Sequence, residues 1–355
     1  MDELLSLTNQ LITIPSVTHS KKALRQIIAL VKKYFSSLTV ESFEKDGFPS
    51  LLIYKQKTRP QKFKIILNAH LDVVEGTKDQ FMPVIKNGRL YARGAADMKA
   101  AAAAEILVFK EVVKQVNYPL ALQLVTDEET NGWRGTKYQL EQGIRSKFVI
   151  TGEPTDLNIG YCAKGIIWLK ISCQGQSSHG AYLWLGNNAI WKMHQFLAKV
   201  KQKYKIPSRA VWKTTLNLSQ ITTTNTTLNR VPSDCQAYFD LRYIPQDKDT
   251  VLKKFLALLP SNFSYEILVN EPSHYTDPNN CYIKILSQTI KQVIGKNPQK
   301  LARNGGSDIR HYSSFNCPGV EFGISGANWH SDNEYAQIAS LKQYYLILKK
   351  FLLSS

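Results

Sequence analysis

The sequence has few cysteines, and none of them stand in a spacing typical of a metal-binding cysteine motif. The five are Cys162, Cys173, Cys235, Cys281 and Cys317, and no two are separated by only two residues. An odd number without such pairs argues against a disulfide framework and against zinc held by thiolates. We therefore expect reduced thiols and a cytoplasmic protein.

Long apolar runs are also missing. The runs Ala100 to Ala104 and Ile106 to Phe109 are interrupted by charge well before the roughly 20 residues that a membrane-spanning helix needs. The N-terminus begins acidic and then becomes amphipathic, whereas a secretory signal begins basic and continues apolar. The sequence thus predicts neither a membrane span nor export.

Acidic residues are scarce relative to basic ones, 28 against 45, and the formal net charge is +17. Such an excess is compatible with nucleic-acid binding. The lysines are spread along the whole chain, however, and the densest tract, Lys192 to Lys205, has the spacing of the solvated face of an amphipathic helix. Because no nucleic-acid-binding motif accompanies them, we expect a solvated lysine-rich surface and no nucleic-acid partner.

What the sequence does contain is an alternation of helix and strand patterns toward both ends. Helical periodicity covers Leu4 to Ile12 and Ala23 to Phe35, and apolar runs predict buried strands at Phe63 to Leu67, Leu120 to Val125 and Lys147 to Ile150. This alternation predicts an α/β fold with a mainly parallel sheet, whose ligand site lies beyond the carboxyl ends of the strands.

The middle of the chain has a different pattern. Between about Lys164 and Glu271, predicted elements follow the order strand, helix, strand, strand, helix, strand. This order predicts a small α+β sandwich of the ferredoxin-like type, inserted into the larger domain, and 355 residues are enough for two compact units. We expect one domain from residues 1–164 and 272–355 and an inserted domain from residues 165–271.

Polar side chains directly follow the strand predicted at Phe63 to Leu67. The next residues, Asn68-Ala-His70-Leu-Asp72, place an imidazole at the strand end and a carboxylate two residues later. This spacing suits a metal-bound histidine whose second nitrogen donates to a carboxylate. A single His-x-Asp pair is more often an ordinary surface or core feature, so the pair alone indicates little.

Four further polar clusters occupy predicted strand ends or loops. They are Asp97 at the start of an alanine-rich helix predicted over 97–113, the acidic run 127–129, Glu153, and His330 after a strand predicted over 319–324. Each has an ordinary explanation by itself, such as a helix N-cap for Asp97 or a solvated turn for the acidic run. Clusters at the carboxyl ends of strands in one sheet converge on one crevice, so together they predict an active site.

The ordered set of motifs resembles the acetylornithine deacetylase and succinyl-diaminopimelate desuccinylase family of zinc metallopeptidases. That family also includes carboxypeptidase and dipeptidase members, and the resemblance covers essentially the whole chain. Its most specific elements are His70-Leu-Asp72, Arg93-Gly-Ala-Ala-Asp97-Met-Lys99, Asp127-Glu-Glu129, Gly152-Glu-Pro154, Ser178-His-Gly180, Asp240-Leu-Arg242, Gly305-Gly-Ser-Asp308 and His330-Ser-Asp-Asn-Glu334.

The resemblance implies a catalytic domain that binds two zinc ions per chain, with cobalt or manganese as conceivable substitutes. The implied ligands are His70 and Glu153 on one ion, Glu129 and His330 on the other, and Asp97 between them. A bridging carboxylate lowers the cost of holding two cations about 3.5 to 4 Å apart, and a water that they share becomes strongly acidic.

The same resemblance implies catalytic roles for Glu128, Asp72 and His179. Glu128 would be the general base that takes a proton from the shared water and delivers it to the leaving amine. Asp72 would fix the ring of His70. The inserted domain would form a homodimer contact, so that His179 stabilises the oxyanion in the active site of the opposite subunit.

Substrate contacts are implied on both domains. Asn229 and Arg242 would hold the carboxylate of the substrate, since a guanidinium fork matches that group. Ser307 and Asp308 resemble a substrate-side loop, although Gly306 stands where relatives often have threonine.

Together these features predict a metal-dependent amidohydrolase acting on a small N-acyl amino acid. His179-Gly-Ala-Tyr182 favours a desuccinylase and Gly152-Glu-Pro-Thr155 an acetylornithine deacetylase, so the acyl group stays open. Aminoacylases, dipeptidases and carboxypeptidases of the same family are the nearest alternatives. A catalytically silent regulatory or nucleic-acid-binding protein is the alternative of another class, and the presence of Glu128 with all five ligands favours the enzyme.

Overall fold

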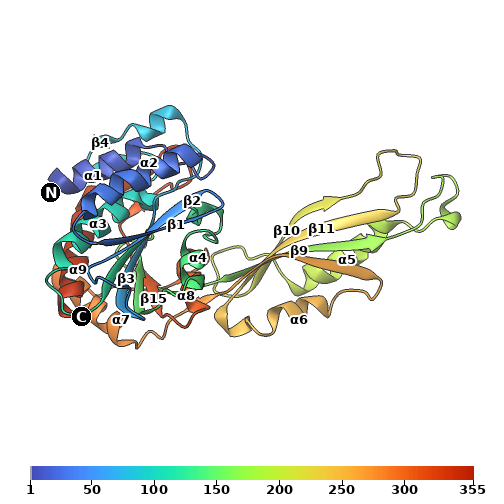
Figure 1. The fold of residues 1–355 in the computed structure, drawn as a ribbon. Coiled ribbons are helices and arrows are strands. Elements are labelled where there is room, and N and C mark those ends of the chain that lie inside the picture. Colours follow the sequence, from blue (N-terminus) through green and yellow to red (C-terminus); the bar gives the residue numbers. More distant parts are fainter. Residues whose placement is uncertain (1) are drawn as a thin grey trace. The chain divides into compact units, whose positions relative to one another are not determined.

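The computed structural model describes residues 2–355, which form two compact units (Figure 1). The larger unit runs through Cys162 and also includes Tyr275–Ala302 and Ser307–Ser355. The inserted unit comprises Ala163–His274 and Arg303–Gly306. Each unit has its own hydrophobic core.

A nine-stranded sheet organises the larger unit. Its order is β1-β2-β6-β3-β7-β15-β8-β13, and β14 also pairs with β8. The central strands β6, β3, β7 and β15 are parallel, whereas β1, β2 and β8 join antiparallel. The prediction of an α/β fold with a mainly parallel central sheet is confirmed. The strands are β1 (Thr39–Lys45), β2 (Phe48–Tyr54), β3 (Phe63–His70), β6 (Leu120–Val125), β7 (Ser146–Thr151), β8 (Ile159–Ala163), β13 (His274–Tyr275), β14 (Lys300–Arg303) and β15 (Gly319–Glu321).

Helices cover both faces of this sheet. Alternate side chains of β3 point to opposite faces of the sheet. Ile65 and Leu67 pack into the main hydrophobic core on one face, and Ile66 packs into a smaller hydrophobic cluster on the other face. Ala100 to Ala104 are fully buried, and these small side chains let α3 approach β3 and its neighbouring helices closely. On the main-core face lie α1 (Asp2–Thr13), α2 (Lys21–Lys32), α3 (Ala100–Val112), α7 (Cys281–Ile294) and α9 (Ile338–Ser354), and on the other α4 (Thr136–Glu141) and α8 (Ile309–Ser313).

A second, smaller sheet of the larger unit is not evident from the sequence. It is antiparallel, with the order β16-β17-β5-β4. The strand predicted over 319–324 is also shorter than expected, because β15 ends at Glu321. The small sheet consists of β4 (Val84–Lys86), β5 (Arg89–Tyr91), β16 (Gly326–Ala327) and β17 (Tyr335–Gln337).

The inserted unit is an antiparallel four-stranded sheet with two helices packed against one face. The strand order is β10-β11-β9-β12, the ferredoxin-like arrangement that the sequence predicts. Burial alternates strictly along β11, because every second side chain faces the helices. The elements are β9 (Gly165–Gln174), α5 (Ala189–Lys203), β10 (Thr215–Thr222), β11 (Asp234–Tyr243), α6 (Val251–Leu256) and β12 (Phe263–Glu271).

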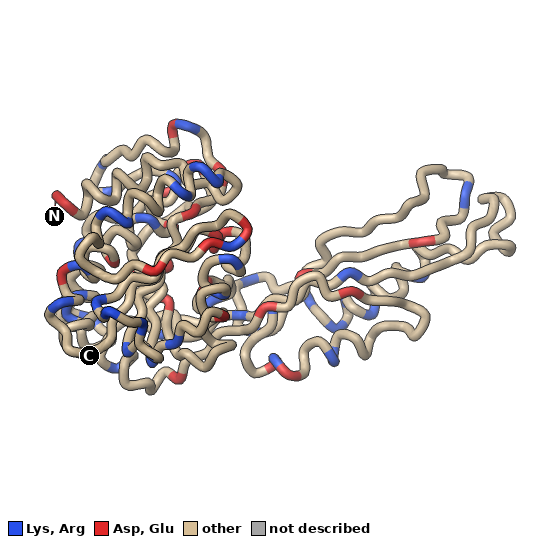
Figure 2. Tube along the Cα trace, viewed as in Figure 1, with Lys and Arg blue, Asp and Glu red and all other residues tan. Residues whose placement is uncertain are grey.

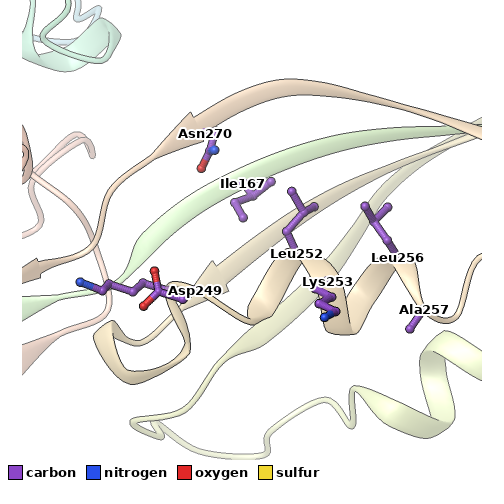
Figure 3. A pocket seen from close by; sticks show the side chains of 8 residues that line it. Ile167, Asp249, Leu252, Lys253, Leu256, Ala257 and Asn270 are labelled. Atoms are coloured by element: carbon purple, nitrogen blue, oxygen red, sulfur yellow. The ribbon is translucent and has the colours of Figure 1, made fainter.

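An open groove runs beside α6 in the inserted unit (Figure 3). Its lining includes Ile167, Leu252 and Asn270, and none of the residues predicted to act in catalysis or binding contributes to it. The groove therefore adds nothing to the candidate site.

Basic residues do not gather in one segment. Figure 2 shows lysine and arginine distributed along the trace of both units. Among residues 2–355, none of the helices is both long and apolar enough to cross a membrane.

Candidate metal centre

The structure brings the five proposed ligands together in two groups. One consists of His70, Asp97 and Glu153, the other of Asp97, Glu129 and His330, and within each group the ligand atoms lie within 4.8 Å of one another. Asp97 belongs to both groups. Each group thus offers one imidazole and two carboxylates.

The distances show how Asp97 is shared. Its Oδ1 atom lies 3.0 Å from Nε2 of His70, and its Oδ2 atom lies 3.3 Å from Nε2 of His330. The His70 nitrogen is also 3.8 Å from Oε1 of Glu153, and the His330 nitrogen is 3.1 Å from Oε2 of Glu129. The two carboxylate oxygens of Asp97 therefore face different histidines, which is the geometry that a bridging ligand needs.

Three of the five ligands come from adjacent parallel strands. His70 is the last residue of β3, Glu129 lies in the turn after β6, and Glu153 follows β7 by two residues. Because β6, β3 and β7 are neighbours and parallel, their carboxyl ends meet at one edge of the sheet.

The other two ligands do not follow strands of the main sheet, which corrects the expectation that all five do. Asp97 lies in a turn between β5 and α3, and His330 lies in the loop between β16 and β17. The small sheet joins these segments, since β5 pairs with β17. Asp97 is also not an N-cap, because α3 begins only at Ala100 and its N-cap residue is Lys99.

Asp72 is fully buried and contacts both His70 and the turn that carries Glu128 and Glu129. The Nδ1 atom of His70 lies 3.0 Å from the backbone carbonyl oxygen of Asp72 and 3.6 Å from its carboxylate, so the carbonyl is the nearer partner. The carboxylate instead accepts hydrogen bonds from the backbone N–H groups of Glu128 and Glu129, each at 3.2 Å. The hydroxyl of Thr18 donates to it at 3.0 Å. Asp72 thus orients the histidine and the acidic turn together.

Glu128 belongs to neither ligand group and lies beside them. Burial, and then the nearby carboxylate of Glu153, raise the pKa of Glu128 well above its usual range. Nη1 of Arg310 lies 3.9 Å from its Oε1 atom, and Nη2 of the same guanidinium donates to the carbonyl of Asn131 at 2.8 Å. Arg310 is buried and was not anticipated from the sequence, because only the folded chain brings α8 against this turn.

Negative charge exceeds positive charge at this centre. Burial alone would lower the pKa of His70, but its contacts with Asp72 and Asp97 keep that pKa well above the ordinary value. Hydrogen bonds to Asp97 and Glu129 raise the pKa of His330 to about 10. Burial raises the pKa of Glu129, against the hydrogen bond from His330. Carboxylate oxygens and imidazole nitrogens are ligands of divalent cations such as zinc. The charge of such cations would neutralise the excess of carboxylates at this centre.

Ser307 and Asp308, proposed as substrate contacts, are buried and bonded to protein groups. The Ser307 hydroxyl donates to Glu321 at 2.5 Å, and the Asp308 carboxylate accepts from the hydroxyl of Thr136 at 2.5 Å. Burial raises the pKa of Asp308 to about 6. Contact with substrate stays a prediction for both residues.

The remaining predicted residues lie in the inserted unit. His179 pairs with Arg230 in an isolated β-bridge, and the N–H of Gly180 donates to the carbonyl of Asn229 at 2.6 Å, so the His179 and Asn229 segments are neighbours. Arg242, on β11, donates from Nε and Nη2 to the two oxygens of Asp240 at 2.7 and 3.0 Å. Part of its guanidinium fork is therefore already occupied.

Similarity to known proteins extends over the whole chain. Residues 66–354 match the family model described as Peptidase family M20/M25/M40. The chain is 28% identical to a succinyl-diaminopimelate desuccinylase of a Nitratiruptor species, over 99% of this chain and 100% of that protein. It is 27% identical to the desuccinylase of Pelagibacter ubique, over 98% and 97%.

Solved structures share the fold. An aminopeptidase from Bacillus cereus superposes with a TM-score of 0.81 at 19% identity, covering 100% of this chain and 99% of that one. A protein from Bacillus subtilis described as a dinuclear metal-binding peptidase of the M20 family gives 0.72 at 12% identity, covering 99% and 97%. The family resemblance read from the motifs is confirmed. The chain belongs to Peptidase family M20/M25/M40 and is a hydrolase of amide or peptide bonds.

Proposed function

We propose that this chain is a di-zinc amidohydrolase that removes the acyl group from a small N-acyl amino acid, with N-succinyl-diaminopimelate as the first candidate substrate. The observation that carries the proposal is the pair of ligand groups sharing Asp97, with Glu128 beside them. The choice of substrate is supported by full-length similarity to two curated desuccinylases.

The side chains present fit two zinc ions. One ion would be held by His70 and Glu153, the other by Glu129 and His330, and Asp97 would contribute one oxygen to each. Imidazole nitrogens and carboxylate oxygens also suit cobalt or manganese. Bound there, two divalent ions would make a water more acidic and polarise the carbonyl of the scissile amide.

Glu128 would move the proton in the reaction. Water adds its oxygen to the acyl carbon, the carbon–nitrogen bond breaks, and the proton taken up by Glu128 passes to the leaving amine. The products are a carboxylate and a free amine. The hydrogen bond from the Glu128 backbone N–H to Asp72 and the Arg310 bond to Asn131 fix the turn from which Glu128 acts.

The larger unit would act as the catalytic domain and the inserted unit as a dimerisation and lid domain. An apolar groove lies between α5 and the edge strand β10, lined by Leu197, Leu216 and Leu218 among others. An unpaired strand edge beside apolar side chains favours association with a second copy. In such a homodimer, His179 would stabilise the oxyanion in the partner's active site.

Asn229 and Arg242 would bind the carboxylate of the substrate. Arg242 uses two of its five N–H donors on Asp240 and keeps the others for a ligand. A substrate carboxylate would therefore approach the part of the fork that Asp240 leaves free.

The cytoplasm is the location we propose. All five cysteines are free, and four of them are buried. Thiols that pack as small apolar groups do not require an oxidising compartment.

A release assay with a small panel of substrates tests the proposed function. The zinc-loaded protein should release amine from N-succinyl-diaminopimelate faster than from N-acetylornithine or from dipeptides. Preference for a dipeptide would favour the peptidase branches, to which several structural neighbours belong. A protein that binds zinc and hydrolyses none of them would contradict the proposed class of substrate.

Mixed dimers test the proposed contribution of His179 across subunits. Glu128→Ala and His179→Ala chains should each be inactive as pure preparations. Combined into heterodimers, they should recover activity, because one site then has an intact base from its own chain and an intact histidine from its partner. Mass measurement must verify the mixing. Inactive verified heterodimers would show that His179 acts within its own chain or has no catalytic role.

A further inference from the structure

Glu334 lies at the end of the loop that carries His330, directly before β17, and is only 2% exposed. Its carboxylate makes contacts that no catalytic role accounts for. Oε2 accepts from Nη1 of Arg93 at 2.8 Å and from the N–H of Gly94 at 3.0 Å. Oε1 accepts from the N–H groups of Ala96 at 2.9 Å and Asp97 at 3.1 Å.

All four donors belong to one turn, residues 93–97, which also carries the ligand that the two metal groups share. A buried carboxylate is costly unless charges and hydrogen bonds compensate it, and here both oxygens are satisfied. Gly94 has a φ of +79°, and a Cβ atom there would lie 2.7 Å from Val73, so the turn depends on glycine at this point. Its N–H groups thereby converge on the carboxylate of Glu334, as in an anion-binding nest.

Two further hydrogen bonds attach the loop that carries His330, one from Gln80 to Asp332 and one from the N–H of Ala92 to the backbone carbonyl of Glu334, and neither reaches Asp97. The His330 side chain is 50% exposed, and its backbone has a φ of +63°. Within the loop, Ser331 bonds back to the carbonyl of Asn328 through both its N–H and its hydroxyl, which shapes the turn but does not attach it to Asp97. The carboxylate of Glu334, four residues beyond the histidine, attaches the loop to the backbone of the Asp97 turn.

We infer that Glu334 is a positioning residue that fastens the His330 loop to the Asp97 turn and so sets the affinity of the metal site formed by Asp97, Glu129 and His330. The inference rests on the proposed two-metal function. The site formed by His70, Asp97 and Glu153 depends less on Glu334, because only Asp97 among its three ligands stands on a segment that Glu334 holds. His70 ends β3 and Glu153 follows β7, both in the main sheet.

Zinc titration of the apoprotein against a competing chelator tests this inference without relying on turnover. Removing a partner that orients a ligand typically weakens metal binding about 10- to 100-fold. Glu334→Ala should therefore weaken one zinc site by about that factor and leave the other within about threefold. Glu334→Gln keeps the volume but places an amide N–H₂ against Arg93 and Gly94, and should weaken the same site.

Tyr118→Phe is the matched control for general destabilisation. It removes a buried hydrogen bond, from the Tyr118 hydroxyl to the carbonyl of Leu352 at 2.5 Å, and touches none of the proposed ligands. This control should bind two zinc ions as the unaltered protein does. Selective loss at one site in both Glu334 variants supports the inference.

Two results would overturn it. In one, both Glu334 variants bind two zinc ions with unaltered affinities, which would refute the role of Glu334 and leave the proposed function intact. In the other, both sites weaken equally, which would make Glu334 a general stabilising residue and not a positioning residue of one site. An unaltered chain that binds no zinc would refute the proposed function, and the inference with it.

Discussion

Replacing Glu128 with alanine is expected to lower turnover by about 10²- to 10⁴-fold while the protein keeps two zinc ions per chain. The carboxylate lies beside the ligand groups and belongs to neither of them. Its removal should therefore abolish proton transfer to the leaving amine and leave the metal ligands in place. Elemental analysis of the purified variant, together with the rate of amine release, measures both effects.

Glu141→Ala serves as the control for this substitution. Glu141 lies at the end of α4 and pairs with Lys45 at 3.7 Å on the surface, so its loss should change neither metal content nor rate. If Glu128→Ala loses zinc in proportion to its activity, Glu128 is a ligand and the assignment of the base is wrong.

Asp97→Ala is expected to reduce the metal content from two ions to fewer than one per chain, with loss of nearly all turnover. Its two oxygens face His70 and His330 separately, so the substitution takes one donor from each group. The cations would lose the anion that lies between them, and binding energy that stabilises the folded state would be lost as well. Elemental analysis and thermal unfolding with and without added zinc measure the two consequences.

Asp332→Ala provides a matched comparison, because it removes a carboxylate from the loop of His330 and not from a ligand group. Asp332 is exposed and accepts a hydrogen bond from Gln80. This variant should keep both ions. Two tightly bound zinc ions in Asp97→Ala would rule out a bridging role for Asp97.

Much of the larger unit could be predicted because its central strands are apolar. The runs at β3, β6 and β7 are almost entirely buried, and each ends within two residues of a polar cluster, so strand and ligand could be recognised together. The small sheet gave no such signal. Its strands are two or three residues long, and β4 is wholly exposed, so no periodic pattern marks them.

The ligands were more predictable than the residues that hold them. His70, Asp97 and Glu129 belong to types that bind metal and stand in recognisable motifs. The role of Glu334 depends on a contact with Arg93 across 241 positions, and that of Arg310 on a bond to Asn131 across 179 positions. Such pairs are fixed by tertiary packing and leave no local pattern in a single sequence.

Restoring metal to the apoprotein is the most direct test of a two-metal amidohydrolase. Zinc should be removed with a chelator and returned in measured steps, while the release of amine from N-succinyl-diaminopimelate is followed. We expect negligible turnover without metal and a rise that saturates at two zinc ions per chain. Full turnover in the metal-free protein, or saturation with no more than one ion bound, would contradict it.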